Sequence, residues 1–168
     1  DHFRFDPERQ DAHMIFGWLQ IGSIWCGFNA ESVLPKWAKC HAHVRGEIDG
    51  FCNLSKPVDA VFIARRRLKL PYLRTPLPGG GVFTKYHHDL CLTELGQSRG
   101  YWELPLWMYP SAGRKPLTYN VDRRKWSKDR EHCYLHAADI GQEFILDCAG
   151  YPDAEVNRWL RRLFAHAV

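Results

Sequence analysis

The strongest constraint on the fold lies near the end of the chain, where apolar residues recur with the period of an α-helix. From Asp153 onward they fall at Val156, Trp159, Leu160, Leu163 and Phe164, which are the i, i+3, i+4, i+7 and i+8 positions of one helix face. Arginines at 158, 161 and 162 occupy the other side. The pattern predicts an amphipathic helix with Asp153 as its N-cap, and its apolar stripe requires a second layer to pack against.

Upstream of this helix, the sequence favours short strands. Residues 13–24 (HMIFGWLQIGSI) are the best strand candidate, and because both alternating faces are largely apolar we expect the strand to be covered on both sides. Gly17 and Gly22 suit a bend or a bulge in a curled sheet. Residues 58–64 and 141–147 are predicted to form further strands.

These elements indicate an α+β fold. Short helices are predicted around Asn29 and from Pro35, while the prolines and glycines of residues 71–81 indicate a loop. We expect one domain over residues 1–168, with residues 1–12 as a loop and a curved, mostly antiparallel sheet packed by short helices and the C-terminal helix. The first residue is Asp1, so we expect a chain taken from a longer gene product.

The composition limits the class of protein. Hydrophobic residues make up 45% and aromatic residues 14% of the 168 residues, which is enough for a globular core. No apolar run approaches the roughly 18 residues that a bilayer crossing needs, so no membrane partner is expected. The six cysteines show no C-x-x-C spacing and predict free thiols in the cytoplasm. The net charge of +4 permits nucleic-acid binding without requiring it.

The segment CHAHV at residues 40–44 places a thiol and two imidazoles close together. In a strand, His41 and His43 would share one face and Cys40 would take the other. Such a His-x-His pair can bind one metal ion if other ligands complete the site. Candidates for those ligands are His13, His87, His88, Asp89, His132 and His136, but no spacing selects among them, so no metal site is assigned. The alternatives are polar pocket walls, histidines bonded to backbone, and direct catalytic contacts.

The segment GQSRGYW at residues 96–102 combines groups that suit an anionic oxygen. A turn flanked by glycines would present the Ser98 hydroxyl, the Arg99 guanidinium and backbone N–H groups together. Tyr101 and Trp102 follow directly and are able to stack on a base. A plain surface turn followed by core aromatics explains the same residues. The serine does not fit the G-x-S-x-G nucleophile elbow.

The segment GQEFILD at residues 141–147 supplies Gln142, Glu143 and Asp147. A carboxylate at a strand end is able to act as a general base or to orient a histidine. A solvated edge residue is the alternative interpretation.

Taken in order, the motifs resemble one bacterial and phage family, nucleotide modification associated domain 3. They are HMIFGWLQIG, WAKCHAH, VFIARRRLKL, GGGVF, LTELGQSRGYWELPLWM, LTYN with Trp126, and GQEFILD, and they span about residues 13–148. The family is described as α+β and is named for its association with nucleic-acid modification systems. Family members begin with a segment containing an FSRKGFD-like motif and a further glycine-rich strand, and this chain contains neither. If those residues belong to the active pocket of the family, this chain lacks part of its site.

Carried over by position, the resemblance implies a set of polar residues for the site. They are His13, Gln20, His41, His43, Ser98, Arg99, Trp102, Gln142, Glu143 and Asp147. We expect His41, His43 and Glu143 to be catalytic. We expect Ser98, Arg99, Trp102, Gln142 and Gln20 to bind substrate or phosphate. The cofactor is unknown.

The predicted partner is a nucleic acid or a nucleotide, within a base-modification or defence system. Two alternatives stay open: a metal-dependent hydrolase or nuclease using His41 and His43, and a non-catalytic reader of modified bases. The strand IFGWLQIG also resembles one in PUA-like and EVE-like base-reading modules, which would make the sheet a partial barrel.

Overall fold

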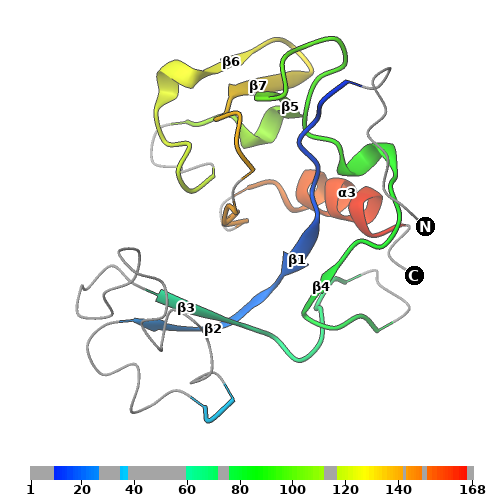
Figure 1. Cartoon of the computed structure of the whole chain (residues 1–168), viewed down its shortest axis with the longest axis vertical. Coiled ribbons are helices and arrows are strands. Elements are labelled where there is room, and N and C mark those ends of the chain that lie inside the picture. Colours follow the sequence, from blue (N-terminus) through cyan, green and yellow to red (C-terminus); the bar gives the residue numbers. More distant parts are fainter. Residues whose placement is uncertain are drawn as a thin grey trace. The chain divides into compact units, whose positions relative to one another are not determined.

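The structure is a computed structural model that describes residues 10–26, 35–37, 60–71, 76–111, 117–141, 143–148 and 151–165. The chain divides into two compact units. The larger unit contains Asp1–Phe16 and Phe83–Val168, and the smaller unit contains Gly17–Val82. Figure 1 shows the helices and strands of both units.

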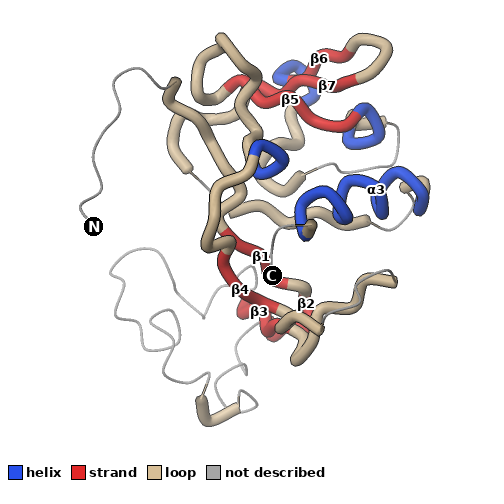
Figure 2. The backbone as a smooth tube through the Cα atoms, turned by 90° about the vertical axis from the view of Figure 1, so that its right-hand side faces the viewer, coloured by secondary structure: helices blue, strands red, loops and turns tan. Residues whose placement is uncertain are grey.

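The larger unit is built on a three-stranded antiparallel sheet. Its strands are β5 (Tyr101–Pro105), β6 (Trp126–Lys128) and β7 (His132–His136), with β7 in the centre. The three strands lie side by side in Figures 1 and 2. Burial alternates along β5 and β7, as expected for strands with one covered face.

The core lies against one face of this sheet. Its buried residues are Leu92, Trp102, Leu104, Met108, Leu117, Trp126, Cys133 and Leu135. Short 3₁₀ helices at His88–Leu90, Leu106–Met108 and Arg123–Lys125 connect the surrounding segments. The indole of Trp107 packs edge-on against Trp159 and Tyr151, with ring centroids 6.0 and 5.1 Å away. This contact joins the 3₁₀ helix Leu106–Met108, which follows β5, to the C-terminal helix.

The predicted C-terminal helix is present as α3 (Asp153–Phe164). Val156, Leu163 and Phe164 are buried, which confirms the predicted apolar stripe. The predicted N-cap is wrong, because Pro152 takes that position without a side-chain hydrogen bond and Asp153 begins the helix. In the first turn, the Asp153 carboxylate still interacts favourably with the helix dipole. With 12 residues, α3 is too short for a bilayer, and no helix among the described residues combines the needed length and apolar character.

The smaller unit contains two antiparallel strand pairs. Strand β1 (Gly17–Leu19) pairs with β4 (Gly80–Val82), and β2 (Ile21–Cys26) pairs with β3 (Ala60–Ala64). The register of β2 shifts between Ile21 and Ser23, so Gly22 lies in a bulge as predicted. Gly17 has a different role: a Cβ atom there would lie 2.5 Å from the Gly81 carbonyl oxygen, so the strand pairing needs glycine.

The single strand predicted over residues 13–24 is two strands with different partners. Its predicted cover on both sides is wrong, because Phe16 is 75% exposed and Leu19 and Ile24 are also exposed. The strand predicted over residues 141–147 is reduced to one bridge between Leu146 and Leu117. The predicted helix near Asn29 lies outside the described residues, and of the one from Pro35 only residues 35–37 are described.

The α+β prediction is confirmed, with antiparallel strands and a C-terminal helix. The sheets formed by the described strands are open at their edges, and a PUA-like partial barrel stays a prediction. The domain boundaries 1–168 also stay a prediction. Cys91, Cys133 and Cys148 are free thiols, as expected. Burial raises the pKa of the Cys133 thiol to about 12, so this residue behaves as a core residue.

Replacing Leu135 tests the placement of the core. Its side chain has 0% exposure on the central strand, so Leu135→Ala should lower the free energy of unfolding by about 2–5 kcal/mol. Leu95 is 91% exposed, and Leu95→Ala should change it by less than about 0.5 kcal/mol. Urea denaturation measures both values. Equal unfolding midpoints for the two variants would contradict this core.

Candidate functional site

The predicted site residues fall into three groups in the structure. Ser98, Arg99, Trp102 and Glu143 belong to the larger unit, and Gln20 belongs to the smaller unit. His41, His43 and Gln142 lie outside the described residues. The description of the site therefore begins with the turn that carries Ser98 and Arg99.

This turn, residues 96–100, immediately precedes β5. The Gln97 N–H donates to the Glu94 carbonyl, and the Tyr101 N–H donates to the Ser98 carbonyl. Gly96 has a φ of 82°, in the left-handed region where glycine is favoured. Local hydrogen bonds and this glycine together determine the path of the 96–100 turn, as the Gly-flanked sequence predicted.

Gln10 binds the backbone at the start of the turn. Its side-chain Nε2 donates to the carbonyl oxygens of Glu94 at 3.0 Å and Gln97 at 2.7 Å. Its Oε1 accepts from the Gly96 N–H at 2.7 Å. One amide side chain, 86 residues from Gly96 in sequence, thus satisfies two backbone groups of the turn and the carbonyl of Glu94 just before it. No short sequence motif contains this partner, so sequence reasoning missed it.

Thr93 binds the backbone near the end of the turn. Its hydroxyl donates to the Arg99 carbonyl at 2.7 Å and accepts from the His13 N–H at 2.8 Å. The hydroxyl belongs to a residue that is only 7% exposed, so both bonds are shielded from water. Gly100 closes the turn, since a Cβ atom there would lie 2.7 Å from the Ala137 carbonyl oxygen.

The side chains of Ser98 and Arg99 face solvent. Ser98 is exposed, and the Arg99 side chain is 42% exposed. The closest carboxylate oxygen to the Arg99 guanidinium among the described residues belongs to Asp11, at 4.0 Å. An ion pair this long between exposed side chains is weak. The guanidinium therefore stays available to an external anion, while the backbone that carries it is held in place.

Trp102 lies on the opposite side of β5, inside the core, and is 2% exposed. Its indole N–H donates to Nδ1 of His13 at 2.9 Å. An acceptor Nδ1 requires the neutral His13 ring to carry its proton on Nε2, and that atom is buried without a hydrogen-bond partner in the described part of the chain. Trp102 is therefore a buried core residue bonded to His13 and is not an open stacking surface.

Gln20 and Glu143 have different surroundings. Both ends of the Gln20 amide bind the backbone of Lys69: Nε2 donates to its carbonyl at 3.1 Å, and Oε1 accepts from its N–H at 2.7 Å. Glu143 is exposed, and the next residue, Phe144, packs its ring 5.9 Å from that of Trp102. Glu143 is thus attached to the core by its neighbour while its carboxylate reaches solvent.

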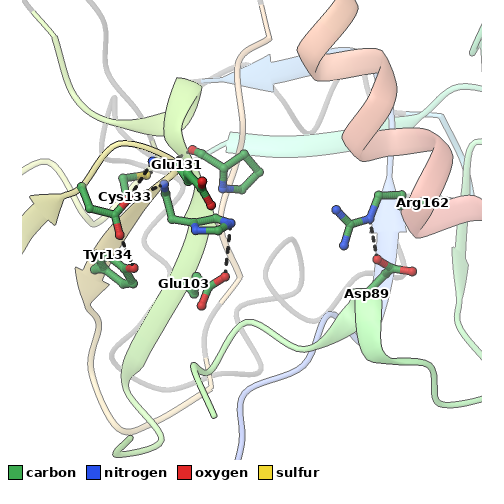
Figure 3. Close-up of polar contacts among 9 residues, drawn as sticks. Asp89, Glu103, Glu131, Cys133, Tyr134 and Arg162 are labelled. Atoms are coloured by element: carbon green, nitrogen blue, oxygen red, sulfur yellow. Dashed lines mark hydrogen bonds and ion pairs between the residues drawn. The ribbon is translucent and has the colours of Figure 1, made fainter.

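The YHHD segment at residues 86–89 contributes a separate polar group in the larger unit. An Asp89 oxygen accepts at 2.6 Å from the Nε of Arg162, a residue of α3 (Figure 3). The other oxygen of Asp89 lies 3.8 Å from Nδ1 of His87, whose side chain is 12% exposed. The His–Asp pair predicted as possible metal ligands therefore has an arginine partner.

The solvent-facing side of β5 and β7 carries polar and aromatic side chains. Tyr101, Glu103, His132, Tyr134 and His136 all alternate with core residues and point away from the core. Nε2 of His132 lies 3.4 Å from the Glu103 carboxylate (Figure 3). The sequence HCYLH at residues 132–136 shows the alternation typical of a strand, although its two histidines are also spaced as on one face of a helix. Sequence reasoning missed this strand, and the alternation was the signal that would have revealed it.

The β6–β7 turn adds a strongly held carboxylate beside this surface. The backbone N–H groups of His132 and Glu131, together with the Tyr134 hydroxyl, hold the pKa of Asp129 at about 2, below its ordinary 3.8. The hydrogen bond to Asp129 also raises the pKa of the Tyr134 hydroxyl. Burial and the negative charges of Asp129, Glu94 and Glu103 raise this pKa further. Tyr134 thus stays a neutral hydrogen-bond donor.

Within the described ranges, no group of three or more His, Cys, Asp or Glu side chains is arranged to hold a metal ion. The predicted His-x-His clamp at His41 and His43 lies outside those ranges.

The frame of the 96–100 turn is testable by removing one hydroxyl. Thr93→Val keeps the side-chain shape but leaves the His13 N–H and the Arg99 carbonyl without their partner. We expect a loss of about 1–3 kcal/mol in the free energy of unfolding and faster amide hydrogen exchange in the turn. Thr84→Val, at an exposed threonine, is the control. An unchanged urea midpoint for Thr93→Val would show that the hydroxyl does not hold the turn.

The Asp129 carboxylate should make stability depend on acid pH. Because its folded pKa of about 2 lies below the ordinary 3.8, its stabilising effect is fully present above about pH 4 and is lost as the pH falls toward 2. Wild type should therefore be more stable than Asp129→Asn near pH 5, with the difference shrinking toward pH 2. Urea denaturation across this range measures the difference. An NMR-measured pKa near 3.8 for this carboxyl would contradict the bonding described.

The sequence matches the family model of nucleotide modification associated domain 3 over residues 2–147. The match includes the 96–100 turn and the whole three-stranded sheet, and it ends before α3. No curated protein and no solved structure matches the chain significantly. Because the match covers most of the 168 residues, the chain belongs to the nucleotide modification associated domain 3 family, and its general role is connected with nucleic-acid modification.

Proposed function

We propose that this protein binds a nucleic acid or a nucleotide and that the 96–100 turn receives a phosphate oxygen. The observation that carries the proposal is the exposed Arg99 guanidinium on a turn whose backbone is bound by Gln10 and Thr93. Family membership supplies the class of partner.

The Arg99 side chain suits this role electrostatically. A guanidinium donates two parallel hydrogen bonds to a phosphate and carries its charge at every physiological pH. The competing Asp11 carboxylate is 4.0 Å away and 67% exposed, so an arriving phosphate has only a weak ion pair to displace. The Ser98 hydroxyl, one residue earlier, adds a neutral donor for the same anion.

Pre-organisation supports the same role. The turn backbone is ordered by the Gln10 and Thr93 hydrogen bonds before any ligand arrives. Binding therefore needs to order only the side chains of Ser98 and Arg99. A smaller entropy loss leaves more of the contact energy for affinity.

The catalytic part of the proposal concerns His41, His43 and Glu143. One histidine, oriented by a carboxylate, would move a proton on the bound base or nucleotide. Gln142, Gln20 and Trp102 complete the proposed set, with Trp102 acting through His13. Mass spectrometric analysis of oligonucleotides after incubation distinguishes turnover from binding alone.

Arg99→Ala should weaken binding to an oligonucleotide and reduce its salt dependence. Loss of one phosphate contact lowers the slope of log K against log salt concentration by about 0.7 for a single strand. Fluorescence anisotropy with a labelled 20-mer at several salt concentrations measures this slope. The control is Arg124→Ala, because the Arg124 guanidinium is already bound to Asp122 at 2.8 Å. An unchanged affinity and slope for Arg99→Ala would exclude the phosphate role.

A further inference from the structure

Three aromatic rings form a continuous surface on the solvent-facing side of the three-stranded sheet. Tyr101 lies directly opposite His136 in the register of β5 and β7, with ring centroids 4.6 Å apart and an interplanar angle of 80°. Tyr134 stacks on Tyr101, with centroids 5.6 Å apart and an angle of 24°. Tyr101, Tyr134 and His136 are called the platform below.

The platform does not belong to the core. The residues next to its members along the strands, Trp102, Cys133 and Leu135, point to the other face and are at most 2% exposed. The two tyrosines are half-buried against each other, and His136 is exposed. The surface is therefore a supported aromatic patch that faces water, and aromatic side chains of this kind are common where proteins contact ligands.

The platform is also rigid before binding. Tyr101 and Tyr134 lie on adjacent, hydrogen-bonded strands, so their spacing follows from the sheet. The Tyr134 hydroxyl donates to Asp129 at 2.7 Å, which fixes the ring. A ligand that stacks here restricts few additional side-chain rotations, so binding costs little conformational entropy.

The charges around the platform select the chemistry of its partner. The carboxylates of Glu103 and Asp129 lie on this side of the sheet, and their negative charge disfavours a phosphate over the rings. A neutral planar base suits the site better, because a carboxylate also accepts hydrogen bonds from base amino groups. The Arg99 guanidinium supplies a positive charge just before the start of β5, two residues from Tyr101.

We propose that the platform stacks an unpaired base of a single-stranded nucleic acid while Arg99 binds the adjacent phosphate. The inference deepens the proposed function and rests on it. A base inside a duplex has both faces covered by its neighbours, whereas an unpaired base offers one face to an aromatic ring. Single strands are therefore the expected substrate class.

The test compares two labelled single strands of equal length, one with bases throughout and one with abasic sites in place of the central bases. Fluorescence anisotropy at fixed low salt should give wild type roughly 5- to 150-fold tighter binding to the strand with bases for each base that stacks. The affinity of wild type for a duplex of the same sequence should not exceed its affinity for the abasic strand by this factor.

The variants assign this preference to the platform. Tyr101→Ala and His136→Ala should weaken binding to the strand with bases and leave binding to the abasic strand unchanged, while Tyr101→Phe should keep the preference. Tyr86→Ala, at an exposed tyrosine outside the platform, is the matched control. If Tyr101→Ala fails to fold, His136→Ala still tests the platform, because His136 is exposed. Tyr101→Phe then shows whether an intact ring at position 101 keeps the preference.

Two results would overturn the inference. One is equal affinity of wild type for the two single strands; a weaker affinity of Arg99→Ala for both would then show that the phosphate contact exists without the platform. The other is a wild-type dimer in sedimentation that His136→Ala dissociates, which would assign the surface to a second copy of the chain.

Discussion

The antiparallel pairing of β5 with β7 is the interaction on which both the core and the candidate site depend. The register runs from Tyr101 opposite His136 to Pro105 opposite His132. Because successive side chains of a strand point to opposite faces, this one register buries Leu135 and turns Tyr134 outward. A slip of one residue would expose the leucines and bury the histidines, at a large cost in free energy. Burial of the core therefore determines which aromatic rings meet on the other face.

The 96–100 turn leads into β5 and carries the Arg99 side chain of the candidate site. Gln10 and Thr93 bind its backbone, and neither takes up the Arg99 side chain. The Thr93 hydroxyl also binds the N–H of His13, whose ring accepts from the buried Trp102. A chain of hydrogen bonds thus connects the core to the turn. The exposed Arg99 guanidinium is therefore carried by a backbone that hydrogen bonds hold in place. Such a backbone allows an anion to bind without a large rearrangement.

Much of the fold follows from local sequence patterns. The apolar period of α3 and the glycine in the β2 bulge are short-range signals, and the structure agrees with both. The strand predicted over residues 13–24 was divided and left partly exposed, because a strand's partners are distant in sequence and local periodicity does not specify them. The N-cap of α3 differed by one residue, a distance over which helix ends commonly vary.

The sequence by itself determined the family, the α+β class and the exposed Ser98–Arg99 turn, because each depends on residues that are close together along the chain. Only the tertiary structure decided that Gln10 holds this turn and that Trp102 is a core residue bound to His13. It also decided that Tyr101, Tyr134 and His136 form one surface. These contacts join residues more than 30 positions apart, and their geometry is set by strand pairing and core packing, which no local pattern encodes.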